Sequence, residues 1–285
     1  MRKNLRIISM LMTLVMAVTI LFAPIQSQAA SGSIKKLKAG KTYKSYDVTG
    51  NGKKDTIKIT QSGYNGDMYK SFKISINGKK AYAYTEKEYP GFYGVEAKLI
   101  TLSNNKKFLF VNSYSWDGDS TICAIFKYKS GKLKKVVDFV KYYQKYGYHG
   151  GADVTGVAGN SIKVKFWTVN YSIGLSNYQM AFRYKGGTLK QDKTKAKLVN
   201  GYSDSNKTNR FTINKSITAY TSPTSGTTAF KLKYGDVITI DQVRVTSSKM
   251  MFRVKCGSKT GWIRALTSYP QSESSYMIRN PHYSG

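Results

Sequence analysis

Short runs of alternating apolar and polar residues, separated by turn-forming residues, most constrain the fold of this 285-residue chain. The run Thr56–Thr60 alternates strictly, and so does Phe72–Ile76, which is followed by Asn77 and Gly78. Alternation with a period of two divides side chains between the two faces of a β-strand, and Asn-Gly between such runs signals a tight hairpin. We therefore predict an all-β fold, with an antiparallel meander over residues 33–199.

The arrangement of the meander stays open at this point. The segments 102–139 and 157–192 repeat the same order of strand, turn and strand, with Phe126 and Phe182 in matching positions. Their spacing is somewhat longer than the roughly 40–50 residues of a typical propeller blade. A propeller-like arrangement and a sandwich of sheets are both compatible with this pattern.

The last third of the chain has a strand pattern in which particular residue types stand at characteristic positions. Its matching residues are Ile217, Ala219, Pro223, Gly235, Val237–Ile240, Val254, Gly257, Gly261, Trp262 and Ile263. In this order they resemble the bacterial SH3-like (SH3b) family over about residues 211–267. Two positions depart from that family, since Tyr220 replaces its usual Arg and Met251 its usual mid-domain Trp.

The resemblance implies a small antiparallel barrel and a binding function. Members of the SH3b family mostly bind bacterial cell-wall peptides and glycans and are not themselves catalytic. The aromatic candidates for a ligand groove are Tyr220, Phe252, Trp262 and Tyr269. The spacing of Trp262 also suits a core position. Because Met251 replaces an aromatic residue of the family, the resemblance supports the fold more strongly than the ligand.

The N-terminus has the three parts of a secretory signal peptide. Arg2, Lys3 and Arg6 precede an apolar run over Ile7–Phe22, and small residues end the segment 1–29. The alternative is an uncleaved membrane anchor, but the apolar run is shorter than the roughly 20 residues that a spanning helix needs. We expect a secreted protein with no membrane span after signal removal.

Charge narrows the choice of partners. The chain has 46 Lys and Arg against 15 Asp and Glu, a formal net charge of +31. Such a surface attracts polyanions. Lysines interleaved with tyrosines would suit nucleic acid in the cytoplasm, but export favours cell-wall peptidoglycan or teichoic acids and no nucleic acid. The alternative is that the lysines only keep the surface soluble.

The segment Asp47–Asp55 has the pattern D-x-T-x-N-G-x-x-D. It resembles the calcium loops of dockerins and integrin-type repeats, and calcium binds several oxygens around a sharp Gly-permitted turn. The candidate ligands are Asp47, Thr49, Asn51, the carbonyl of Lys53, and Asp55. Thr49 stands in place of a carboxylate and Lys58 in place of the bidentate Glu of an EF-hand, which predicts a weak site. The alternative is a tight turn in which both Asp side chains accept backbone hydrogen bonds.

Catalysis is not expected. The chain has two Cys and two His, too few for a zinc hydrolase, and Cys123 lies in an apolar strand pattern rather than beside a His. The acid pairs Glu86/Glu88 and Asp117/Asp119 cannot be judged as glycosidase carboxylates from the sequence. We predict a secreted, cell-wall-associated binding protein. A wall glycan or peptide hydrolase, and an adhesin or ligand-sensing module that binds its partner through residues 33–199, are the alternatives.

Composition divides the chain into five parts. They are a signal peptide (1–29), an N-terminal β-domain (33–199), a polar linker (200–210), the SH3-like domain (211–267) and a loose tail (268–285).

Overall fold

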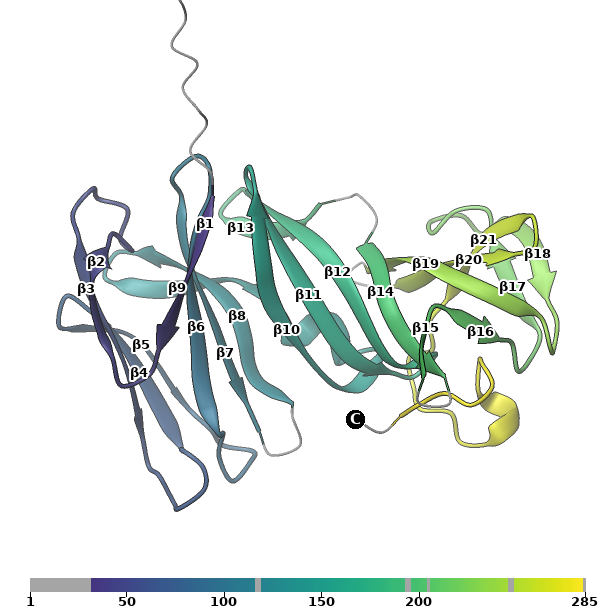
Figure 1. The fold of residues 1–285 in the computed structure, drawn as a ribbon, viewed down its shortest axis with the longest axis horizontal. Coiled ribbons are helices and arrows are strands. Elements are labelled where there is room, and N and C mark those ends of the chain that lie inside the picture. The colour runs from purple at the N-terminus through teal and green to yellow at the C-terminus, as the bar shows by residue number, and fades with distance from the viewer. Residues whose placement is uncertain (1–31, 116–118, 193–195, 204–205, 246–248, 284–285) are drawn as a thin grey trace, which may run out of the picture. The chain divides into compact units, whose positions relative to one another are not determined.

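The computed structural model describes residues 32–283, except 116–118, 193–195, 204–205 and 246–248 (Figure 1). The predicted signal peptide lies outside the described residues. In the part of the chain that is described, no helix is long and apolar enough to cross a membrane.

The first half of the chain forms two antiparallel sheets, in which neighbouring strands follow one another in sequence except that β1 pairs with β6. One has the order β2-β3-β4-β5 and the other the order β1-β6-β7-β8-β9. Their strands are β1 (Ser33–Lys38), β2 (Thr42–Tyr46), β3 (Asp55–Ser62), β4 (Ser71–Ile76), β5 (Lys79–Thr85), β6 (Gly94–Thr101), β7 (Lys107–Tyr114), β8 (Ser120–Lys129) and β9 (Lys132–Asp138). The predicted hairpin at Asn77-Gly78 joins β4 to β5, and both of its residues have positive φ, as a tight hairpin turn requires.

The second half contributes one sheet with the order β10-β11-β12-β14-β19-β20-β21-β17-β18 (Figure 1). The short strands β13, β15 and β16 pair with β12, β14 and β19. The bounds are β10 (Gly147–Ala158), β11 (Ser161–Asn170), β12 (Gly174–Lys185), β13 (Thr188–Gln191), β14 (Ala196–Ser203), β15 (Asn206–Thr208), β16 (Arg210–Thr212), β17 (Ile217–Tyr220), β18 (Thr228–Leu232), β19 (Val237–Val245), β20 (Met250–Cys256) and β21 (Lys259–Arg264). A short helix, α2 (Val140–Tyr143), precedes β10, and a 3-10 turn occupies Glu273–Ser275.

The all-β prediction is confirmed, but the expected C-terminal barrel is not closed. Among the described residues every sheet is antiparallel and none closes on itself. Strand β19 pairs with β14 through Ala196↔Val243 and Lys197↔Gln242, besides its pairing with β16 and β20. The strands of residues 211–267 therefore continue a sheet that begins within the predicted N-terminal domain, instead of forming a separate barrel.

Two segments that were expected to be irregular contain strands or buried residues in their described parts. Residues 200–210, predicted as a linker, contain the end of β14, all of β15 and the start of β16. Within the predicted tail 268–285, Met277 and Ile278 are buried, and Ile278 forms a β-bridge with Ile213. The polar composition of both segments gave no sign of regular structure in the sequence. Strand pairing can nevertheless form there, because it satisfies backbone groups whatever the side chains are.

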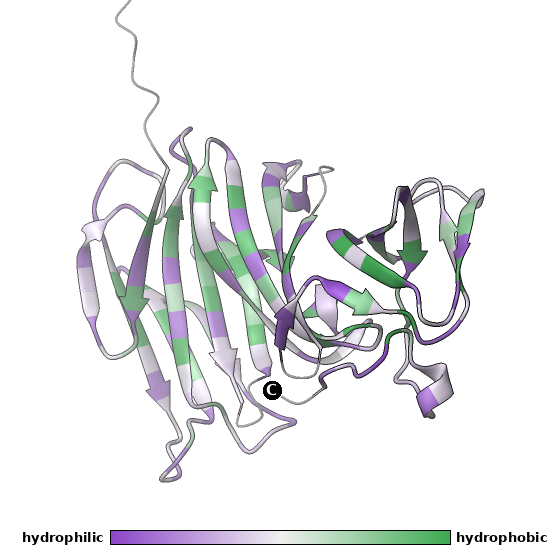
Figure 2. Ribbon diagram, turned by 45° about the vertical axis from the view of Figure 1, so that its right-hand side comes forward, coloured by the Kyte–Doolittle hydropathy of each residue, from purple (hydrophilic) through white to green (hydrophobic). Residues whose placement is uncertain are grey.

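The five-stranded sheet is buried on both faces. Along β7, Phe108 and Phe110 belong to a core shared with the second half of the chain, whereas Leu109 and Val111 belong to a core shared with the four-stranded sheet. Figure 2 shows apolar residues along these strands. Stacked sheets with a doubly buried middle layer fit the sandwich alternative rather than the propeller, and explain why β7 and β8 have continuous apolar runs.

Candidate functional sites

The loop between β2 and β3, together with the first residue of β3, contains all five predicted calcium ligands. Asp47 Oδ1 accepts hydrogen bonds from the backbone N–H groups of Gly50 (2.6 Å) and Asn51 (3.1 Å), and Oδ2 accepts one from Gly52 (2.9 Å). The Asn51 side chain accepts a bond from the Lys53 amide (2.8 Å). The loop is thus folded around Asp47 by its own amides.

Asp55 closes the loop from its far end. Its Oδ2 accepts the amides of Val48 and Thr49, both at 2.8 Å, and its Oδ1 accepts the side-chain N–H of Asn77 at 2.7 Å. Burial raises the pKa of Asp55, but the bonds from Thr49, Asn77 and Val48 outweigh it, so the pKa lies below its ordinary value. A carboxylate held ionised in this way stabilises the turn.

These contacts are the ones expected for the tight-turn alternative. Calcium binding by this loop stays a prediction. Among the described residues no group of three or more His, Cys, Asp or Glu side chains is placed to hold a metal ion. The predicted ligands are two carboxylates, Thr49, Asn51 and a carbonyl. This donor set is that of a weak calcium site, since calcium prefers more carboxylates.

The four predicted ligand-binding aromatics lie in different settings. Tyr220 lies opposite Trp262 in the β17–β21 pair, and the Arg264 guanidinium lies over the Tyr220 ring at 6.0 Å. Phe252 is completely buried in the core, so the prediction that it faces a ligand is not met. Its position in β20 puts it on the inner face beside Ile263, which the alternation of residues alone could not distinguish from an outer face.

Tyr269, the fourth predicted residue, belongs to a cluster that we call the tyrosine cluster: Tyr171, Tyr269, Tyr276 and Tyr283. The Tyr269 ring lies 5.1 Å from that of Tyr283, 6.4 Å from Tyr171 and 6.5 Å from Tyr276. Tyr269 is 40% exposed and the other three rings are half-buried. The Tyr283 hydroxyl donates to the Tyr171 carbonyl at 2.9 Å, which fastens the C-terminal segment to the β11–β12 turn.

Three members of this cluster were missed by sequence reasoning. Tyr276 and Tyr283 lie in the segment predicted to be a loose tail, and Tyr171 lies 40 positions before the SH3-like region. A local signal did exist, because Tyr269, Tyr276 and Tyr283 recur at even spacing. The part played by Tyr171 depends on long-range packing and has no such signal.

A cavity of about 450 Å³ lies beside α2. Its described lining comes from the end of β5 and the following loop, the start of β8, and α2. These residues are Ala83–Tyr89, Asp119–Thr121, Val140, Tyr143 and Gln144. Both acid pairs considered in the sequence therefore contribute to this lining, through Glu86, Glu88 and Asp119. Asp117 lies outside the described residues.

Glu86 organises one wall of this cavity. Its Oε1 accepts the amides of Lys87 (2.8 Å), Glu88 (2.9 Å) and Tyr89 (3.2 Å), and its Oε2 accepts the Tyr84 hydroxyl (2.6 Å). Burial raises the pKa of Glu86, but these four hydrogen bonds outweigh it and the pKa lies below its usual value. Glu86 is therefore an anion at neutral pH.

Asp119 pairs with His149 at the edge of the same region. Its Oδ2 lies 3.0 Å from His149 Nδ1, and its Oδ1 accepts the Gly150 amide at 2.8 Å. The nearby Cys123 is buried, and burial raises the pKa of its thiol to about 12. A thiol with this pKa is protonated at neutral pH and is a poor nucleophile. Cys123 and Cys256 are not bonded to each other.

Comparison with protein-family models, curated proteins and solved structures found no match. The SH3-like resemblance therefore stays a prediction.

Proposed function

We propose that this is a secreted, non-catalytic protein that binds the bacterial cell envelope, with peptidoglycan or teichoic acid as its partner. The signal-peptide pattern of residues 1–29 and the SH3-like pattern of residues 211–267 support this proposal. The single observation that carries it is the partly exposed tyrosine cluster around Tyr269 on a chain of net charge +31.

The tyrosine cluster suits a glycan in physical terms. Tyrosine rings offer apolar faces for sugar C–H groups and hydroxyls for sugar oxygens, and they lose little conformational entropy on binding. Four rings within 5.1–6.5 Å of a neighbour provide a platform larger than one ring. Lys215 lies at its side, where its ammonium donates to the Ser275 carbonyl at 2.5 Å.

The excess of lysine supplies the second part of the binding. Lysines on exposed strand positions attract the phosphates of a wall polymer over long range, and salt screens this attraction. Affinity for walls should thus combine a salt-sensitive term from charge with a salt-resistant term from the tyrosines. In the same proposal, the loop 47–55 binds calcium weakly and stabilises the β2–β3 hairpin.

Sedimentation of the purified protein with isolated cell walls tests the proposal. We expect binding that weakens as salt rises, and a Tyr269→Ala variant that loses most of the binding left at about 0.5 M salt. Tyr93→Ala is the matched control, because Tyr93 is 41% exposed against 40% for Tyr269 and lies outside the cluster. No binding even at low salt would refute the proposal.

The same incubation separates binding from hydrolysis. A binding protein leaves the wall intact, so the supernatant should contain no new reducing ends or free amines. Release of soluble muropeptides would support the hydrolase alternative instead. Equal loss of binding in the Tyr269 and Tyr93 variants would show that the tyrosine cluster is not the contact.

A further inference from the structure

The cavity beside α2 has the opposite charge to most of the protein. Among its described lining residues Glu86, Glu88 and Asp119 are acidic, and Lys87 is basic. In the whole chain, by contrast, 46 Lys and Arg face 15 Asp and Glu. A local excess of acid in so basic a chain makes this cavity unlike the surface around it.

The negative charge of the cavity is only partly neutralised by its neighbours. Glu86 is held by three backbone amides and a tyrosine hydroxyl, all of them uncharged donors, so its full charge remains. Asp119 lies 3.0 Å from His149 Nδ1 and accepts the Gly150 amide, an uncharged donor. Low-dielectric walls concentrate the field of such groups inside a cleft. A cation that is repelled elsewhere on this protein is attracted here.

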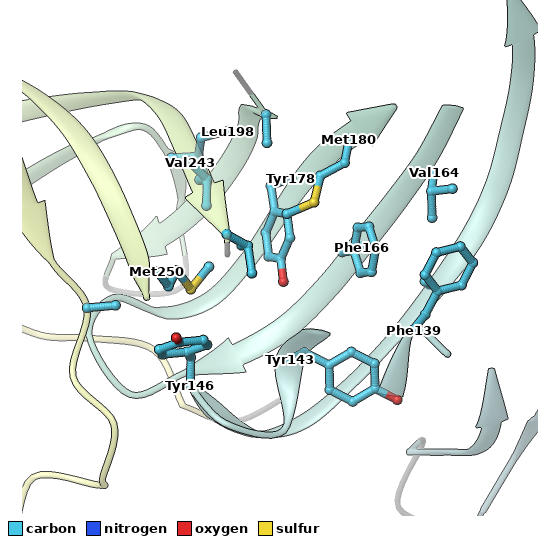
Figure 3. Close-up of a cluster of buried hydrophobic side chains, with 14 of the residues drawn as sticks. Phe139, Tyr143, Tyr146, Val164, Phe166, Tyr178, Met180, Leu198, Val243 and Met250 are labelled. Carbon is cyan, nitrogen blue, oxygen red and sulfur yellow. The ribbon is translucent and has the colours of Figure 1, made fainter. Parts of the chain in front are cut away.

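Tyr143 adds a polar group to the cavity. It is 3% exposed, and none of the described residues forms a well-aligned hydrogen bond with its hydroxyl. Figure 3 shows this hydroxyl turned away from Tyr146 and Tyr178, whose rings belong to the apolar core. Burial raises the pKa of Tyr143, so the phenol is neutral and its oxygen can accept a hydrogen bond. The Ser120 side chain is a hydrogen-bonding neighbour of this hydroxyl, and because a phenol oxygen has two lone pairs it can accept from a ligand as well.

We propose that the cavity binds a small ligand bearing a primary ammonium group. An ammonium carries three N–H donors, and the lining offers carboxylate oxygens, the Tyr143 hydroxyl and the Ser120 hydroxyl as acceptors. A quaternary ammonium has no N–H to donate and would leave these acceptors unused. The volume, about 450 Å³, lies within the roughly 300–1,000 Å³ of small-ligand sites. This inference does not depend on envelope binding.

Calorimetric titration of the purified protein with Nα-acetyl-lysine amide tests the proposal. The matched ligand is Nα,Nε-diacetyl-lysine amide, which has the same backbone and chain but no charge. We expect heat and saturation with the first compound and at least about tenfold weaker binding of the second, since hydrogen bonds to a charged group are the strong ones. Equal affinities, or no binding of the amine, would overturn the proposal.

Two variants locate the site. Tyr143→Phe keeps the ring and removes the hydroxyl, and should weaken amine binding about tenfold. Glu88→Gln removes an exposed charge and should weaken it about two- to fivefold, as expected of a solvated pair. Glu96→Gln is the control, because Glu96 is an exposed acid on β6 outside the cavity. Equal effects of the Glu88 and Glu96 changes, with Tyr143→Phe unaltered, would show that binding occurs elsewhere.

Discussion

Two nearly buried carboxylates, Asp55 and Glu86, have similar surroundings and different roles. They are 2% and 3% exposed, and each accepts backbone amides together with one side-chain donor. The donors of Asp55 come from two hairpins, since Val48 and Thr49 precede β3 and Asn77 lies in the β4–β5 turn. The donors of Glu86 all lie within three residues of it. Asp55 therefore joins two parts of a sheet, whereas Glu86 shapes one loop at a cavity.

The largest expected effect is the loss of Asp55. Asp55→Ala leaves the buried Val48 amide and the Asn77 amide without acceptors, so we expect unfolding free energy to fall by about 3 kcal/mol. Glu86→Ala should cost less, about 1–2 kcal/mol, because the freed amides belong to the exposed Lys87 and Glu88 and can bond to water. Urea denaturation measures both. Equal losses would contradict the distinction between Asp55, which joins two parts of a sheet, and Glu86, which bonds within one loop.

A second test uses pH, since hydrogen bonding keeps the pKa of both carboxylates below the ordinary values of 3.8 for Asp and 4.5 for Glu. The unfolded chain then takes up these protons at higher pH than the folded protein. The stabilisation is present above the unfolded pKa values and is lost as pH falls through the folded ones. Unfolding free energy should decline from about pH 4.5 downward.

The two carboxylates should act in offset pH windows. Glu86→Gln should flatten the upper part of the decline, which begins near 4.5, and Asp55→Asn the part that begins near 3.8. Thermal melts between about pH 2 and 7 measure both. A decline that both variants leave unaltered would show that other groups dominate acid unfolding.

The sequence predicted the Asp55 turn better than the Glu86 loop for a physical reason. Asp47 begins the turn that Asp55 closes, and the partners of Asp47 lie within a few residues of it. Gly and Asn at fixed positions therefore indicate this turn in the sequence. Glu86 also bonds locally, but its loop has no Gly or Asn pattern. Its place in the cavity wall depends on the packing that brings the start of β8 and α2, both distant in sequence, to the same cavity. Only that packing turns an ordinary Glu into part of a cavity wall.

The same contrast holds for the fold. Alternation and the Asn77-Gly78 turn predicted the all-β class and the β4–β5 hairpin, because both depend on neighbouring residues. The pairing of Ala196 with Val243 is a long-range choice that no local pattern encodes. That pairing joins the predicted SH3-like strands to the preceding domain and leaves the barrel open. The predicted linker forms strands through other pairs, β15 with β14 and β16 with β19.

Calcium should have the smallest effect, and it should act at only one of the two carboxylate turns. A weak extracellular site has a Kd of about 1 mM. At about 5 mM calcium such a site would add about 1 kcal/mol to unfolding free energy, or about 2–4 °C in melting temperature. Asp47→Ala should abolish this shift because it removes a ligand, and Glu86→Ala should preserve it because Glu86 lies outside the loop. Melting in calcium against a chelator measures the shift. An unchanged melting temperature in the unmodified protein would show that the loop 47–55 is a turn held by its own amides. Asp55 and Glu86 would then differ only in whether their hydrogen-bond donors are distant or local in sequence.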